Sequence, residues 1–197
     1  VKSSLRGLRK VDPVHYRREV RTRDMWAPTP PMADACSGVA SVLGAVNFDP
    51  ELYGMAGLVC YHAGDSRKAS SYLSRSLQDD PRNWSGLLYS ALLSIDAGDA
   101  GKAGRYSEKL VSEHRDVGVF FLYRGMALEQ SEQTEEARTA YDTALTYDRD
   151  LVWAHHRLGM VYREEGRSSD AKREFQKAHE QDPALTEPHR MIFESNS

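Results

Sequence analysis

The sequence predicts an all-α protein built from four copies of a two-helix unit stacked as a solenoid. Three sets of residues recurring at a constant spacing of 34 residues carry this prediction. Small residues recur in two columns: Ala69, Ala103, Ala137 and Ala171, and Gly57, Ala91, Gly125 and Gly159. A turn column reads Gly64, Gly98, Glu132 and Gly166. A closing column reads Pro81, Arg115, Arg149 and Pro183.

Each copy reads as two helices, most clearly in the last one. Apolar residues at helical spacing lie on both sides of the segment "EEGRSSD". Gly166 is suited to the positive φ of a helix end, and Ser168 or Ser169 to capping the next helix. We expect repeats at 50–83, 84–117, 118–151 and 152–185. Arg115 and Arg149 stand where proline would close the repeat, which predicts more continuous junctions there.

Two stretches, "AGLVCYHAGDSRKASSYLSRSLQDDP" and "LGMVYREEGRSSDAKREFQKAHEQDP", resemble the tetratricopeptide repeat (TPR) family. The resemblance covers about residues 50–185. It implies a right-handed α-solenoid of four stacked helix-turn-helix repeats, in which the first helix of each repeat lines a concave, peptide-binding face. Ser94 and Ser107 depart from the family pattern, which has large apolar residues at these places, so the second repeat is the least typical.

Both ends of the repeat array look like covers for its terminal repeats, which otherwise leave an apolar face open. Residues 32–49 predict an N-terminal capping helix with Ala35, Val39, Val42 and Val46 on one side. Residues 186–197 predict a C-terminal capping helix that presents Met191, Ile192 and Phe193. Residues 1–31 are expected to form a basic, partly extended N-terminal arm.

Charge is distributed unevenly along the chain. Residues 1–26 carry a formal charge of +5, and the remainder must carry −8 to give the net −3. The arm has three interpretations: a solvated helix without a partner, a membrane-surface contact, or a contact with nucleic acid or an acidic protein. We do not expect nucleic acid, because no recognition motif is present. A cytoplasmic location is expected, with membrane association through a missing upstream segment as the alternative.

The remaining chemistry-bearing residues predict no catalytic or metal site. No apolar run is long enough to span a bilayer. Cys36 and Cys60 are expected to be reduced and buried, with one bridge as the alternative. Adjacent His155 and His156 point about 100° apart on a helix and cannot share a metal. No phosphate-binding glycine loop or nucleophile elbow occurs, so we expect no cofactor and no enzyme activity.

The resemblance places the peptide groove on five columns of the first helices. The carboxylate-gripping residues of one TPR subclass are absent, because Gly54, Leu58, Tyr89, Leu122 and Met126 occupy their positions. What remains is an apolar floor with positive charge in the last repeat, suited to an apolar or amphipathic segment with an acid. The expected groove residues are Leu58, Tyr61, Leu88, Tyr89, Leu92, Leu122, Tyr123, Met126, Trp153, His156, Arg157, Met160 and Arg163.

These patterns predict a non-enzymatic protein–protein interaction module, acting as a scaffold, adaptor or chaperone with a protein or peptide partner. One alternative is a self-assembling structural protein whose groove is filled by its own N-terminal arm, from the same or another copy. The segment "MWAPTPPM" at residues 25–32 would enter the groove in that case. Another alternative is a regulatory fragment of a larger protein that is linked to a membrane or to DNA.

Overall fold

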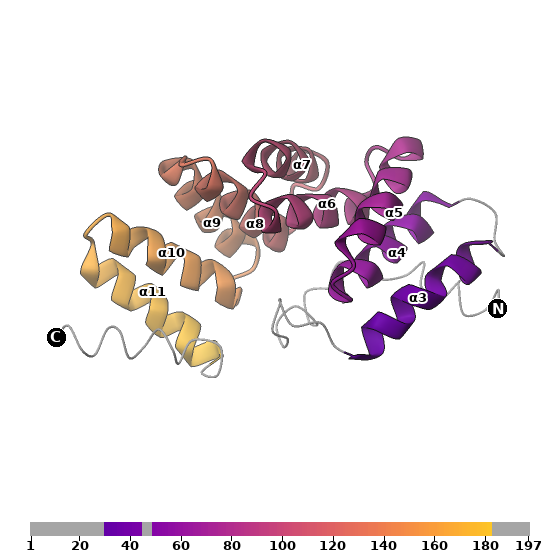
Figure 1. Ribbon diagram of the computed structural model, residues 1–197. Helices are drawn as coiled ribbons and strands as arrows, with labels where there is room; N and C mark the ends of the chain where they lie inside the picture. The colour runs from indigo at the N-terminus through magenta and orange to yellow at the C-terminus, as the bar shows by residue number, and fades with distance from the viewer. Residues whose placement is uncertain (1–29, 45–48, 183–197) are drawn as a thin grey trace. The chain divides into compact units, whose positions relative to one another are not determined.

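The computed structural model describes residues 30–44 and 49–182, and in this part of the chain all regular structure is helical (Figure 1). The chain is therefore all-α. The first described helix is α3 (Pro30–Gly44), and four helical hairpins follow. The hairpins are α4 (Pro50–His62) with α5 (Ser66–Asp79), α6 (Trp84–Asp96) with α7 (Ala100–Glu113), α8 (Gly118–Gln130) with α9 (Thr134–Tyr147), and α10 (Val152–Glu164) with α11 (Ser168–Gln181).

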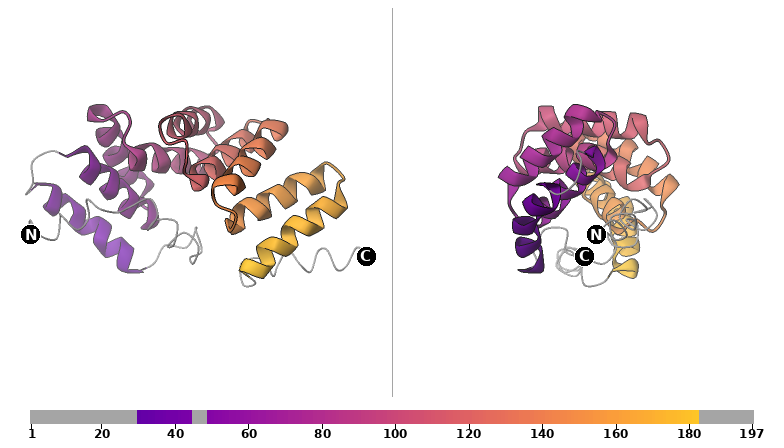
Figure 2. Two further views of the ribbon diagram at one scale, coloured as in Figure 1. Left: turned by 180° about the vertical axis from the view of Figure 1, so that it is seen from behind. Right: turned by 90° about the vertical axis from the view of Figure 1, so that its right-hand side faces the viewer.

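The helices form two compact units that meet in the sequence between Arg115 and Asp116. Unit 1 contains α3 to α7: α3 packs against α4, and α6 packs against α4, α5 and α7. Unit 2 contains α8 to α11: α9 packs against both α8 and α10. The α10–α11 hairpin, whose two helices lie side by side, is seen from the other side in Figure 2.

The helix bounds follow the 34-residue period in all four repeats. Each first helix has 13 residues, each second helix has 14, and corresponding helices start 34 residues apart. The prediction of more continuous junctions at Arg115 and Arg149 is wrong. The backbone leaves the helical region at His114 and at Asp148, as it does at Asp80 before the closing proline. Proline is therefore not required for the break.

The turn inside each hairpin needs a left-handed residue. Gly64, Gly98 and Gly166 have φ values of 78°, 70° and 74°. The third repeat has Glu132 in this position, with φ 60°. A side chain in this region of φ/ψ space crowds the following carbonyl, whereas glycine adopts it without that penalty.

Helix starts differ between the two units. Each of the helices α4 to α7 is preceded by a residue whose side chain accepts a hydrogen bond from a backbone N–H of the first turn. These capping residues are Asp49, Asp65, Asn83 and Asp99. No side-chain cap bond begins α8 to α11. The predicted serine cap of the last helix is wrong, because Ser168 is already the first residue of α11 and Arg167 holds the cap position.

The small-residue column lets the two helices of a hairpin approach closely. A Cβ built on Gly125 would lie 2.3 Å from Cε1 of the fully buried Tyr141, and one on Gly57 would lie 2.4 Å from Cδ2 of Leu73. The second repeat has alanine, Ala91, in this column, and the position that matches Tyr141 is Ser107. In the second repeat, the larger Ala91 on the first helix thus occurs with the smaller Ser107 on the second helix. This size exchange accounts for the serine at position 107.

The predicted caps are only partly visible. Helix α3 lies where the N-terminal capping helix was expected, but the predicted inner face is rotated: Ala35 is exposed, Val39 is half-buried and Cys36 is buried. Val46, the N-terminal arm over residues 1–29, and the C-terminal cap with Met191, Ile192 and Phe193 lie outside the described residues. No described helix is long and apolar enough to cross a membrane.

Candidate peptide-binding surface

The first helix of the first repeat, α4, carries a half-exposed stripe. Glu51, Met55, Leu58 and Tyr61 follow one another at helical spacing on α4, and all four are only partly buried. At the end of this stripe, the hydroxyl of Tyr61 donates to Oδ2 of Asp96 at 2.9 Å, and its ring lies 5.4 Å from that of Tyr89. We call these four residues the α4 stripe.

The last repeat carries the equivalent stripe in unit 2. Trp153, Arg157, Met160 and Arg163 occupy the same positions on α10, and all four are half-buried. Arg157 Nη1 pairs with Glu129 Oε2 of α8 at 3.2 Å. Arg163 Nη2 lies 3.1 Å from the sulfur of Met160 and forms no ion pair with a carboxylate of the described residues. We call these four residues the α10 stripe.

The thirteen expected groove residues divide into two groups. Six belong to the two stripes and keep partial exposure: Leu58, Tyr61, Trp153, Arg157, Met160 and Arg163. The other seven are buried and lie within helix packing rather than on an open wall: Leu88, Tyr89, Leu92, Leu122, Tyr123, Met126 and His156. These seven side chains are therefore not accessible to a ligand as the described helices are packed.

Three of the seven buried residues, Leu88, Leu122 and His156, belong to one column. The column that runs Gly54, Leu88, Leu122 and His156 is buried in all four repeats, so it faces neighbouring helices throughout. The ring of His156 lies between those of Trp153 and Phe175, with centroids 5.7 and 5.5 Å away. Helix α6 packs against three other helices of unit 1, which leaves little of its surface for a ligand.

Electrostatics at the two stripes differ. Burial raises the pKa of the Glu129 carboxyl above its ordinary value, and the charge of Arg157 partly offsets the increase. Burial also raises the pKa of Asp96, against the hydrogen bond from Tyr61. Arg157 is thus largely committed to Glu129. Arg163 is the cation of the α10 stripe whose charge no described carboxylate neutralises.

The histidine pair has a structural role at His155, which is 6% exposed. Its Nδ1 lies 2.7 Å from Oε2 of Glu174, and its Nε2 lies 3.0 Å from the carbonyl oxygen of Arg149. Burial would raise the pKa of Glu174, but hydrogen bonds from His155 and Lys177 outweigh it and hold that pKa at about 2. His155 therefore ties α10 to α11 and to the preceding junction.

The expectation of two free cysteines is wrong, because Cys36 and Cys60 form a disulfide. The sequence offered one usable signal: each cysteine lies in an apolar helical stretch, one in the cap and one in the first repeat. Among the described residues, no group of three histidine, cysteine, aspartate or glutamate side chains is arranged to hold a metal ion.

Comparisons with known proteins agree with this architecture. Residues 152–185 and residues 124–151 each match a tetratricopeptide repeat family. A comparison with curated proteins gives no match. Among solved structures, the chain is similar to MamA 41-end from Desulfovibrio magneticus RS-1, at 18% identity over 88% of this chain and 97% of that one, with a TM-score of 0.68. MamA from AMB-1 is 22% identical over 87% of this chain and 92% of that one, with a TM-score of 0.61.

Proposed function

We propose that this chain, whose residues 124–151 and 152–185 match tetratricopeptide repeat families, is a non-enzymatic protein-interaction scaffold whose contact surfaces are the α4 stripe and the α10 stripe. The observation that supports this most directly is the exposure pattern. Of the four equivalent positions on each first helix, the terminal repeats keep all four partly exposed, whereas the second repeat buries all four. Partly exposed leucine, methionine, tyrosine and tryptophan side chains are typical of protein contact sites.

The partner that fits the α10 stripe is an amphipathic or extended apolar segment with an acidic residue. Trp153 and Met160 offer apolar contact area, and the methionine adapts to ligands of different shape. Arg163 offers a guanidinium to a carboxylate without first breaking an ion pair with a described residue. Arg157 would have to leave Glu129 to do the same. A short peptide bound in this way is expected in the micromolar range, about 8 kcal/mol.

A peptide-display selection against the full chain tests the proposal. Selected peptides should combine apolar residues with aspartate or glutamate. Met160→Glu should weaken their binding by about tenfold or more, because it puts a charge into the apolar contact. Arg163→Glu should weaken the binding of the acidic peptides in particular, because it replaces the guanidinium by a negative charge. Thr146→Glu on α9 is the control, because Thr146 is exposed on a second helix. The proposal fails if the two α10 variants fold and bind the peptides as the unaltered chain does.

The self-filled surface stays the alternative proposal. Its occupant would be the N-terminal arm, which lies outside the described residues. Removing residues 1–29 decides between the two. An occupied surface should then bind display-selected peptides more tightly than before, or change the oligomeric state measured by sedimentation. Equal affinity and equal sedimentation would leave only the open surface.

A further inference from the structure

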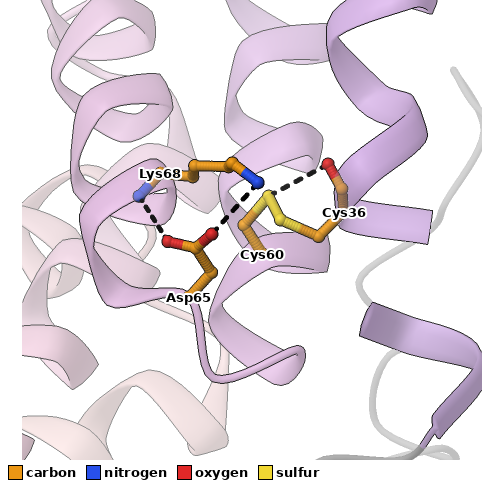
Figure 3. The surroundings of a disulfide bond; sticks show 4 residues. All are labelled: Cys36, Cys60, Asp65 and Lys68. Carbon is orange, nitrogen blue, oxygen red and sulfur yellow. Dashed lines mark hydrogen bonds and ion pairs between the residues drawn. A yellow bond between two sulfur atoms is a disulfide. The ribbon is translucent and has the colours of Figure 1, made fainter. Parts of the chain in front are cut away.

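The helix α3 is joined to the first repeat by a covalent bond. Figure 3 shows the disulfide between Cys36 of α3 and Cys60 of α4. Both cysteines are buried, at 2% and 0% exposure. The bond closes a loop over a sequence separation of 24 residues, which contains the connection from α3 to α4. Two contributions therefore hold α3 on the first repeat: the disulfide bond and the packing of α3 side chains against α4.

Among the α3 side chains that the structure describes, few are buried against the rest of the unit. Of the α3 residues whose side chains the structure describes, Cys36 alone is buried, and Val39 and Leu43 are half-buried. The others are exposed: Asp34, Ala35, Ser37, Gly38, Ala40, Ser41 and Gly44. Burial of apolar area is the main force that holds a helix against its neighbour, and few buried contacts are typical of segments that open locally.

The surface beneath α3 is apolar and belongs to three helices. Cys36 packs into a cluster with Cys60 and Ala69, which are both fully buried. Five partly buried residues surround that cluster: Val59, Tyr61, Ala63, Tyr72 and Leu93. They come from α4, the following turn, α5 and α6. Without α3, the apolar side of the first repeat would face water.

We propose that the Cys36–Cys60 disulfide is a redox latch that keeps α3 on the first repeat, and that its reduction releases α3 while the repeats stay folded. This inference is independent of the proposed peptide binding. The hairpins α4–α5 and α6–α7 have their own packed interiors, with Leu73, Leu87 and Leu110 almost fully buried, and the main packing partner of α3 is α4. Only the cap depends on the sulfur–sulfur bond.

A dithiol reductant of the thioredoxin class supplies the chemistry. Its thiolate attacks one sulfur of the Cys36–Cys60 bond and forms a mixed disulfide, while the other cysteine leaves as a thiolate and takes up a proton. The second thiol of the reductant then attacks the mixed disulfide and frees the remaining cysteine. Two electrons and two protons are transferred in total: the reductant ends as a disulfide and the protein as two thiols. Because both cysteines are buried, attack requires a local fluctuation that exposes one sulfur while the bond is still intact, and α3 is released only after the bond is broken.

Hydrogen exchange of the full chain, with and without dithiothreitol, tests the latch. In the reduced chain, backbone amides of residues 34–44 should exchange about tenfold faster or more, while those of α6 and α7 keep their rates. Cys36→Ala should behave as the reduced chain does, and dithiothreitol should then have no effect. Reduction should also increase the fluorescence of a hydrophobic dye, because the cluster around Cys60 becomes accessible.

Three results would overturn the latch. If α3 stays equally protected after reduction, packing holds the helix and the bond is dispensable. If α4 to α7 lose protection together with α3, or if Cys36→Ala does not fold, the bond stabilises the whole unit. If thiol titration after equilibration with oxidised glutathione finds two free thiols in the denatured chain, the bond does not form.

Discussion

Gly125→Ala should destabilise the protein, although alanine is the better helix former. The added Cβ would lie 2.3 Å from Cε1 of Tyr141 and 2.7 Å from Cδ1 and Cζ. Carbon atoms pack at about 3.5–4.0 Å, so the overlap exceeds about 1 Å. Tyr141 is fully buried and cannot turn away. Such overpacking costs about 1–3 kcal/mol, and the gain in helix propensity returns about 1 kcal/mol. An overlap this large should cost about 3 kcal/mol, the upper end of that range, so we expect the free energy of unfolding to fall by about 2 kcal/mol after the gain in helix propensity.

Gly159→Ala is the matched control in the last repeat. Its Cβ would lie 3.0 Å from the ring of Phe175, which is 8% exposed and has room to shift. The propensity gain should then offset the overlap to within about 0.5 kcal/mol. The free energy of unfolding from urea denaturation, followed by circular dichroism, measures both variants.

A second background isolates the steric cause. With Tyr141→Ser, position 141 matches Ser107, and Gly125→Ala then recreates the Ala91–Ser107 pair of the second repeat. The loss of about 2 kcal/mol should disappear and become a gain of up to about 1 kcal/mol. The reasoning is refuted if Gly125→Ala is at least as stable as Gly159→Ala, or if its effect is the same in both backgrounds.

Three further predictions concern single side chains. Glu132→Gly should raise the free energy of unfolding by about 1 kcal/mol, because it relieves the left-handed backbone at φ 60°; an unchanged melting temperature would contradict it. The pKa of Glu174 is lowered from its ordinary value of 4.5 to about 2 in the folded protein, so the stability that its ionised carboxylate contributes is complete above pH 4.5 and is lost as the pH falls toward 2. That contribution is about 3 kcal/mol. In Glu174→Gln, this part of the pH dependence of the free energy of unfolding, measured by urea denaturation between pH 2 and 4.5, should disappear. Tyr61→Phe should raise the pKa of Asp96 further in a carboxyl NMR titration, because the donated hydrogen bond lowers it; an identical titration curve would show that the bond is absent in solution.

Much of the fold follows from the sequence because the repeat period is a local property. The spacing of Gly57, Gly125 and Gly159 fixes which helix faces meet, and the close approaches in the structure agree with it. Proline at the junctions was a weaker guide, since the backbone leaves the helix at His114 and at Asp148 without one. The residue type at the junction position therefore does not by itself show whether the helix ends there.

The candidate surface was harder to predict, because a column identifies a face but not how far neighbouring helices cover it. Met160 and Met126 occupy the same column, yet Met160 is half-buried and Met126 is 4% exposed. The disulfide was missed for a similar reason. Cys36 and Cys60 come together only when α3 is placed against α4, and the expected inner face of α3 centred on Ala35 and Val39 rather than on Cys36.

The uniform helix bounds have a consequence for how this chain can change in length. Deleting residues 66–99 would join Asp65 to Ala100, and Asp65 would then take over the bond that Asp99 makes to the backbone N–H of Lys102. Gene duplication or loss in whole 34-residue steps thus leaves every turn with the residues it requires, whereas any other step size puts a wrong residue at each boundary.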